Sequence, residues 1–167
     1  MNELAITVIG PDRTGIIAEV TEALAEVGAN LTDSTMTRLR GHFAMTLICT
    51  GPTAEQVDKA LSPLAGLLST VRAVEPESDS DADGEPYLVS VHGADRLGIV
   101  AAVTRVVAET GGNITDLTTR LTGPLYVLVA EVGLPAGTAD HLAMRLAVTA
   151  QELGVDVTLR HAESEIL

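Results

Sequence analysis

Two short loops carry the residues whose types and spacing are best suited to bind a small ligand. They are Gly10-Pro-Asp-Arg-Thr-Gly-Ile16 and Gly93-Ala-Asp-Arg-Leu-Gly-Ile99, and each stands just before a helical apolar pattern. Backbone N–H groups at a helix start are unpaired and lie at the positive end of the helix dipole, so they suit a carboxylate or a phosphate. Glycines let a ligand approach the backbone closely. The alternative interpretation is a tight turn in which the aspartate caps the helix.

A second pair of polar segments follows each of these helices. Asn30-Leu-Thr-Asp33 and Asn113-Ile-Thr-Asp116 stand where the helix returns to the next strand. Their amide and carboxylate groups are able to orient a polar ligand, and we expect them near the loops. The alternative is a plain helix-to-strand turn, because asparagine tolerates left-handed backbone geometry.

Nucleotide, metal and catalytic chemistry are not indicated. Neither phosphate-loop spacing, G-x-x-x-x-G-K-[ST] or G-x-G-x-x-G, is present, and no serine stands in a G-x-S-x-G turn. The single cysteine, Cys49, lies in an apolar run and is expected to be a buried strand residue. The four histidines show no metal-ligand spacing, although His92 ends the strand before the second loop and is a candidate for tuning that site. We therefore expect no enzyme activity, no metal and no cofactor.

The two loops belong to an internal repeat. A shift of 83 residues superimposes fifteen identical residues between Leu4 and Asp33 without a gap, which indicates duplication. Between the copies, Glu75–Pro86 holds six acidic residues, no basic residue and no apolar periodicity, as is typical of a solvated linker. The sequence thus predicts a first domain at 1–75, an acidic linker at 76–85 and a second domain at 86–167.

Periodicity in the first copy predicts six elements. A buried strand at 4–9 is followed by a helix that ends at Gly28, and strands at 31–39 and 43–50 form a hairpin through Gly41. Thr53-Ala-Glu-Gln56 is a capping box that opens a second helix, which Pro63 should kink or end near Ser62. A last strand contains Val71 and Val74. The expected apolar helix faces are Ile16, Ile17, Val20, Leu24 and Val27, then Val57, Leu61, Leu64 and Leu68.

The second copy repeats this order, with strands at 87–92 and 155–160, helices at about 97–110 and 138–153, and a hairpin through Gly123-Pro124. Each copy is therefore βαββαβ. The predicted fold class is α+β: two tandem ferredoxin-like domains with four-stranded antiparallel sheets and helices on one face. Because the other sheet face is bare and edge strands gain from pairing, we expect a homodimer.

The order of strand, [GP]-x-D-R-x-G-I-[IV], helix, G-x-N-[LI]-T-D and hairpin resembles the ACT domain, and the tandem form resembles the glycine cleavage system transcriptional repressor family. The resemblance implies that a small amino acid binds at the first strand-to-helix loop, with glycine or serine as the first ligands to test. Position 14 is Thr where position 97 is Leu, so the two sites need not be equivalent. The implied ligand-binding residues are Asp12, Arg13, Thr14, Gly15, Ile16, Asn30 and Asp33, with Asp95, Arg96, Leu97, Gly98, Ile99, Asn113 and Asp116 in the second copy.

The N-terminal pattern also resembles the regulatory domain of formyltetrahydrofolate deformylase. Here a second ACT-like unit follows the first, where such an enzyme would carry its hydrolase domain. A formal charge of −13, one Phe, two Tyr and no Trp disfavour direct contact with nucleic acid. No run of 18 apolar residues occurs, so we expect no membrane span and a cytoplasmic location.

The leading hypothesis is an amino-acid-responsive regulator that acts through a transcription regulator in glycine or one-carbon metabolism. The alternative is a regulatory subunit of an amino-acid metabolic enzyme, since the same domain would serve either partner. A free-standing enzyme ranks third, and a scaffold would take first place if no amino acid bound.

Overall fold

The computed structural model describes residues 3–76 and 84–162, and the chain divides into two compact units, Met1–Ser78 and Asp79–Leu167. The last strand of the first unit ends at Val74, and the first strand of the second begins at Glu85. Most of the linker expected at 76–85 lies outside the described residues, so those domain boundaries stay a prediction.

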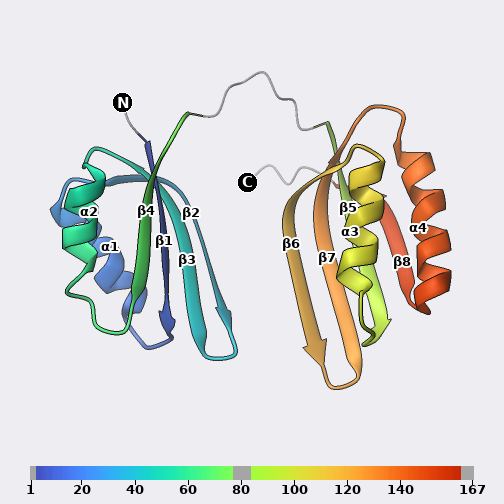
Figure 1. Ribbon diagram of the computed structural model, residues 1–167, viewed down its shortest axis with the longest axis horizontal. Helices are drawn as coiled ribbons and strands as arrows, with labels where there is room; N and C mark the ends of the chain where they lie inside the picture. The colour runs from blue at the N-terminus through green and yellow to red at the C-terminus, as the bar shows by residue number, and fades with distance from the viewer. Residues whose placement is uncertain (1–2, 77–83, 163–167) are drawn as a thin grey trace. The chain divides into compact units, whose positions relative to one another are not determined.

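The first unit has the order βαββαβ (Figure 1). Its elements are β1 (Glu3–Pro11), α1 (Ile16–Glu26), β2 (Asn30–Leu39), β3 (His42–Thr50), α2 (Ala54–Leu61) and β4 (Leu68–Val74). The strands form an antiparallel sheet in the order β2-β3-β1-β4. Both helices lie on one face of this sheet, as the sequence predicts for a ferredoxin-like unit.

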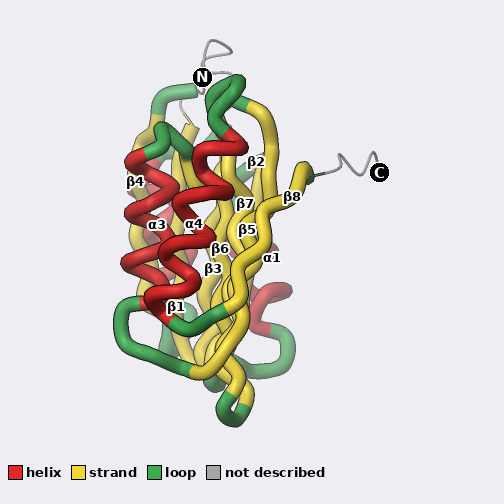
Figure 2. Tube along the Cα trace, turned by 90° about the vertical axis from the view of Figure 1, so that its right-hand side faces the viewer, coloured by secondary structure: helices red, strands yellow, loops and turns green. Residues whose placement is uncertain are grey.

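The second unit repeats the arrangement. Its elements are β5 (Glu85–Ala94), α3 (Ile99–Glu109), β6 (Asn113–Thr122), β7 (Leu125–Leu134), α4 (Ala139–Leu153) and β8 (Asp156–His161). The sheet order is β6-β7-β5-β8, again antiparallel, and α3 and α4 lie side by side on one face (Figure 2). The predicted fold class is confirmed for both units.

Each core lies between the sheet and its two helices. Alternate residues of β1, Leu4, Ile6 and Val8, are buried, because successive strand side chains point to opposite faces. They pack with Phe43, the only phenylalanine of the chain, which is fully buried on β3. Cys49 is also fully buried there, as predicted.

Several details of the expected helix faces are wrong. Ile17 is 37% exposed, because the buried stripe of α1 is narrower and holds only Ile16, Val20 and Leu24, and Val27 lies beyond the last residue of the helix. Leu64 lies beyond α2 and Leu68 belongs to β4, where it is 77% exposed, because α2 ends at Leu61 ahead of Pro63.

The start of α2 follows its sequence signal. Thr53 accepts a hydrogen bond from the Gln56 amide, and the Gln56 side chain accepts one from the Thr53 amide, at 3.2 and 2.9 Å. This completes the predicted capping box. The helix ends with Ser62 as its C-terminal cap, which confirms the expected effect of Pro63.

The edge strands β2 and β6 are held by hairpins. Arg40 and Gly41 both adopt positive φ angles of 49° and 77°, as a two-residue type I′ turn requires. Nine of the ten residues of β2 are exposed, since the helices do not reach over this edge of the sheet.

Among residues 3–76 and 84–162, no helix is long and apolar enough to cross a membrane.

Candidate functional site

The two strand-to-helix loops share one backbone design. Gly15 and Gly98 occupy the N-cap positions of α1 and α3 with φ angles of 85° and 88°, and neither helix receives a side-chain cap. The left-handed conformation favours glycine at this position. The interpretation of Asp12 and Asp95 as helix caps is therefore wrong, because each lies three residues before the cap.

Backbone donors remain open at these helix starts. In the first unit, the first helical hydrogen bond runs from the Glu19 amide to the Gly15 carbonyl at 3.0 Å, and the Ile16 amide donates to Arg13 at 3.3 Å. Within residues 3–76, the amides of Ile17 and Ala18 have no such partner. Open amides at a helix start favour a negatively charged group.

Each charged side chain of the first loop is paired with a residue of a neighbouring element. Arg13 binds Glu19 of α1 through a short ion pair, and Arg38 of β2 lies 3.3 Å from the Asp12 carboxylate. The hydrogen bond from Arg13 lowers the pKa of Glu19, and the same bond raises the pKa of Arg13. Both ionisable residues of the loop thus already have an opposite charge beside them.

The second loop differs in each of these contacts. Arg96 donates from Nη1 to the backbone carbonyl of Glu152 in the last turn of α4, at 2.9 Å. Asp95 forms no ion pair with any residue in 84–162. The positions that match Glu19 and Arg38 after the shift of 83 are Ala102 and Leu121, which carry no charge.

A surface depression of about 600 Å³ lies at the second loop. All five residues expected there, Asp95 to Ile99, line it, together with Val100, Ala101 and Tyr126. Leu97 is 98% exposed at its edge. The depression thus combines two charged side chains with an apolar wall.

The asparagine segments do not join the loops. Asn30 pairs with Thr50, which in turn pairs with Glu3 at the start of β1, whereas the loop follows the end of β1. An 11-residue helix separates them by about 16 Å, because it runs back along the sheet. The expectation that Asn30 and Asp33 lie near the loop is wrong for this reason.

The same holds in the second unit, where α3 starts at the end of β5 and runs back to the start of β6 (Figure 1). Asn113 instead lines a separate depression of about 520 Å³ between α3 and β6, with Thr104 and Arg105 on its wall. Asp116 follows a bulge in the pairing of β6 with β7. Asn30 and Asn113 also do not form the left-handed turn, which falls on Gly28 and Gly111.

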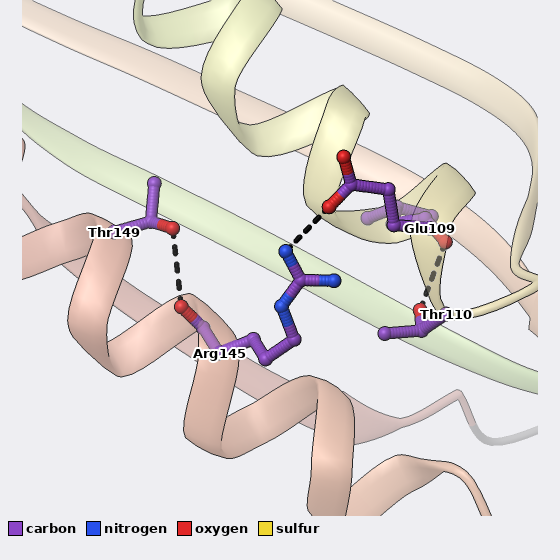
Figure 3. Close-up of polar contacts among 5 residues, drawn as sticks. Glu109, Thr110, Arg145 and Thr149 are labelled. Atoms are coloured by element: carbon purple, nitrogen blue, oxygen red, sulfur yellow. Dashed lines mark hydrogen bonds and ion pairs between the residues drawn. The ribbon is translucent and has the colours of Figure 1, made fainter.

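Close to this end of α3, an ion pair ties the two helices together (Figure 3). Arg145 of α4 binds Glu109 of α3, while Thr149 donates to the Arg145 carbonyl at 3.1 Å and Thr110 donates to Val107 at 2.8 Å. Thr149 is buried, so its hydroxyl is satisfied within its own helix. The buried Leu142 and Leu146 pack α4 against the core of the second unit, and the last turn of α4 accepts the hydrogen bond from Arg96.

His92 and Cys49 are not part of the depression at the second loop. His92 lies 3.3 Å from Asp156 of β8 and does not line the depression beside Asp95. Burial raises the pKa of the Cys49 thiol. Within the described ranges, no group of three or more His, Cys, Asp or Glu side chains is placed to hold a metal ion.

Sequence reasoning missed several residues that set the character of the loops. The sequence could have indicated that Glu19 and Arg38 make the two loops different. The matching positions after the shift of 83 residues are Ala102 and Leu121, which carry no charge. The contact of Arg96 with Glu152 spans 56 residues of sequence and carries no local signal.

A family model described as the ACT domain matches the chain twice, over residues 2–72 and 85–160. The chain belongs to the ACT domain family, as a tandem pair. ACT domains are regulatory domains that bind small molecules, amino acids among them.

Related proteins occur with one unit and with two. A UPF0237 protein of Methanocaldococcus jannaschii is 33% identical over 78 residues, covering 87% of that protein and 46% of this chain. A solved structure of an unknown protein from Galdieria sulphuraria covers 97% of this chain and 99% of its own, with 30% identity and a TM-score of 0.84. A protein provisionally assigned as a glycine cleavage system transcriptional repressor shares the fold, at 21% identity, a TM-score of 0.72 and 98% coverage of both chains.

Proposed function

We propose that this chain is a non-catalytic regulatory protein that binds a small amino acid at a strand-to-helix loop and acts by contact with another protein. The observation that carries the proposal is the depression at the second loop, where Asp95 and Arg96 meet an apolar wall at the start of α3. An amino acid presents opposite charges a few bonds apart, and this loop presents both complements.

The chemistry of the loop matches such a head group. The Asp95 carboxylate accepts hydrogen bonds from an ammonium group, while the Arg96 guanidinium and the helix-start amides donate to a carboxylate. Charge-assisted hydrogen bonds of this kind contribute about 1.5–3 kcal/mol each.

The ligand and the protein partner are proposed from the family resemblance. Resemblance to the glycine cleavage repressor family makes glycine and serine the first ligands to test, and a transcription regulator of glycine or one-carbon metabolism the first partner. A regulatory subunit of an amino-acid metabolic enzyme is the alternative, because the same domain would serve a catalytic partner. In either case we propose a cytoplasmic homodimer, supported by the bare sheet faces and the long exposed edge strand β2.

Calorimetric titration of the full chain against the twenty amino acids tests the ligand. We expect heat and a thermal shift with at least one of them, and no response to any would leave a scaffold in first place. Affinity purification from native extract tests the partner, since recovery of a metabolic enzyme without a transcription regulator would favour the alternative. Light scattering that gave a 17.3 kDa mass over a wide concentration range would exclude the dimer.

A further inference from the structure

We infer that amino-acid binding is confined to the second unit, which holds one ligand per chain, and that the ligand has an apolar side chain. This inference rests on the proposed function and deepens it. It begins from the contrast between the two loops, which share the Asp-Arg-x-Gly-Ile backbone but differ in the charges around it.

The first loop has its charges compensated internally. Arg38 lies beside Asp12 and Glu19 lies beside Arg13, so each charged group of the loop has an opposite partner from the same unit. An incoming ammonium group would compete with Arg38 for the Asp12 carboxylate. An incoming carboxylate would compete with Glu19 for the Arg13 guanidinium, so this loop gains less from a zwitterion than a loop whose charges have no such partners.

The second loop retains both charges for a ligand. Ala102 and Leu121 replace the two compensating residues, and Asp95 has no ion-pair partner in 84–162. Arg96 gives one donor to the neutral Glu152 carbonyl, which orients the guanidinium and leaves its charge and remaining donors available. An ammonium at Asp95 and a carboxylate at Arg96 therefore replace water without breaking an existing ion pair.

The apolar wall sets the class of side chain. Leu97 is 98% exposed where the first loop has Thr14, and Val100 and Tyr126 line the same depression of about 600 Å³. A ligand side chain that covers this wall removes apolar surface from water, which glycine cannot do. The chemistry therefore points to a branched aliphatic amino acid in place of the glycine or serine that the family resemblance suggests, and L-leucine is the natural probe.

The first test is calorimetry of the full chain with L-leucine and with glycine. We expect one leucine per chain, with glycine about tenfold weaker or more. Asp95→Asn should weaken leucine binding about ten- to hundredfold, because it removes a charge-assisted contact, whereas the matched variant Asp12→Asn should change the affinity less than about twofold. Two leucines per chain, tighter binding of glycine, or loss of binding in Asp12→Asn would overturn the inference.

A second test moves the compensating charges. The double variant Ala102→Glu with Leu121→Arg gives the second loop the partners that Glu19 and Arg38 provide in the first. It should lose leucine binding with an unchanged far-ultraviolet circular dichroism spectrum, while the control pair Ala102→Gln with Leu121→Gln keeps it. Full affinity in the charged variant would overturn the inference, and if that variant fails to fold, Asp95→Asn decides. Absence of binding by any amino acid to the parent chain contradicts the proposed function itself, whereas binding that depends on Asp12 contradicts only its confinement to the second unit.

Discussion

The two units share the same order of strands and helices, and they differ in the charged and apolar side chains that their surfaces expose. In the first unit, α2 has eight residues and its outer face is charged, with Lys59 and Glu55 paired at 3.2 Å. In the second, α4 has fifteen residues and leaves Met144 and Val148 exposed at 64% and 55%. The loops also differ: the charged residues of the first loop form ion pairs, whereas Arg96 of the second loop binds a neutral backbone carbonyl.

This difference teaches that duplication preserved the chain path more strictly than the surface chemistry. The fifteen identities fall on the end of β1, the loop, α1, the turn after it and the start of β2, and they include Gly15 and Gly28, whose positive φ angles favour glycine. The partners of the loop stand elsewhere, at Glu19, Arg38 and their counterparts, and these have changed. A matching motif is therefore not evidence of a matching site.

The largest expected effect tests the two cores. Phe43→Ala should cost about 3–5 kcal/mol in the free energy of unfolding, because the ring is fully buried. Tyr126→Ala at the matching position should cost less, because the Tyr126 side chain is only partly buried. Native-state hydrogen exchange resolves the two units. Exchange should accelerate across β1 and β3 in the first variant, and equal acceleration in both units would contradict independent cores.

The next effect concerns close packing at the ends of β1 and β5. A Cβ added at Gly10 would meet the Gly66 carbonyl oxygen at 2.6 Å, whereas at Gly93 it would meet a methyl group of Val155 at 2.9 Å. Backbone yields less easily than a side chain, so Gly10→Ala should cost about 1–3 kcal/mol and Gly93→Ala less. Urea denaturation of the two variants measures the order, and a larger loss for Gly93→Ala would refute this comparison.

A smaller effect distinguishes the helix starts. Thr53→Ala removes the side-chain acceptor of a capping box and should cost about 1 kcal/mol. Thr138→Ala should cost less, because the Thr138 hydroxyl does not cap α4 and only donates to the Pro135 carbonyl at 2.7 Å. Thermal unfolding gives the comparison, and Thr53→Ser, which keeps the hydroxyl, is the control. Equal losses for both alanine variants would contradict the difference in capping.

The smallest effect is the pH response of the paired loop. The pKa of Glu19 lies below its ordinary value of 4.5, chiefly because of the hydrogen bond from Arg13. The pair therefore stabilises the first unit above that value, and this contribution is lost as pH falls through the lowered pKa. Carboxyl titration by NMR should show Glu19 returning toward its ordinary pKa in Arg13→Gln, and no change would show that the pair does not persist in solution. The second unit has Ala102 at this position and should show no equivalent response.

The sequence alone determined the chain path of each unit, because local signals specify it. Gly28 ends α1, the Arg40-Gly41 turn forms a hairpin, the capping box starts α2 and Pro63 ends it, all within a few residues of the signal. Resemblance and repeat together identified the family, which the domain matches confirm. The apolar run around Cys49 also predicted the burial of that residue.

Only the tertiary structure decided which of the candidate residues share a site. An intervening helix carries the chain about 16 Å from loop to asparagine, so short separation in sequence became long separation in space. The opposite happened to Arg96 and Glu152, which are 56 residues apart and in hydrogen-bond contact. Charge compensation depends on such contacts, because Coulomb attraction and hydrogen bonds act across space and not along the chain. For that reason two loops with the same motif acquired different chemistry.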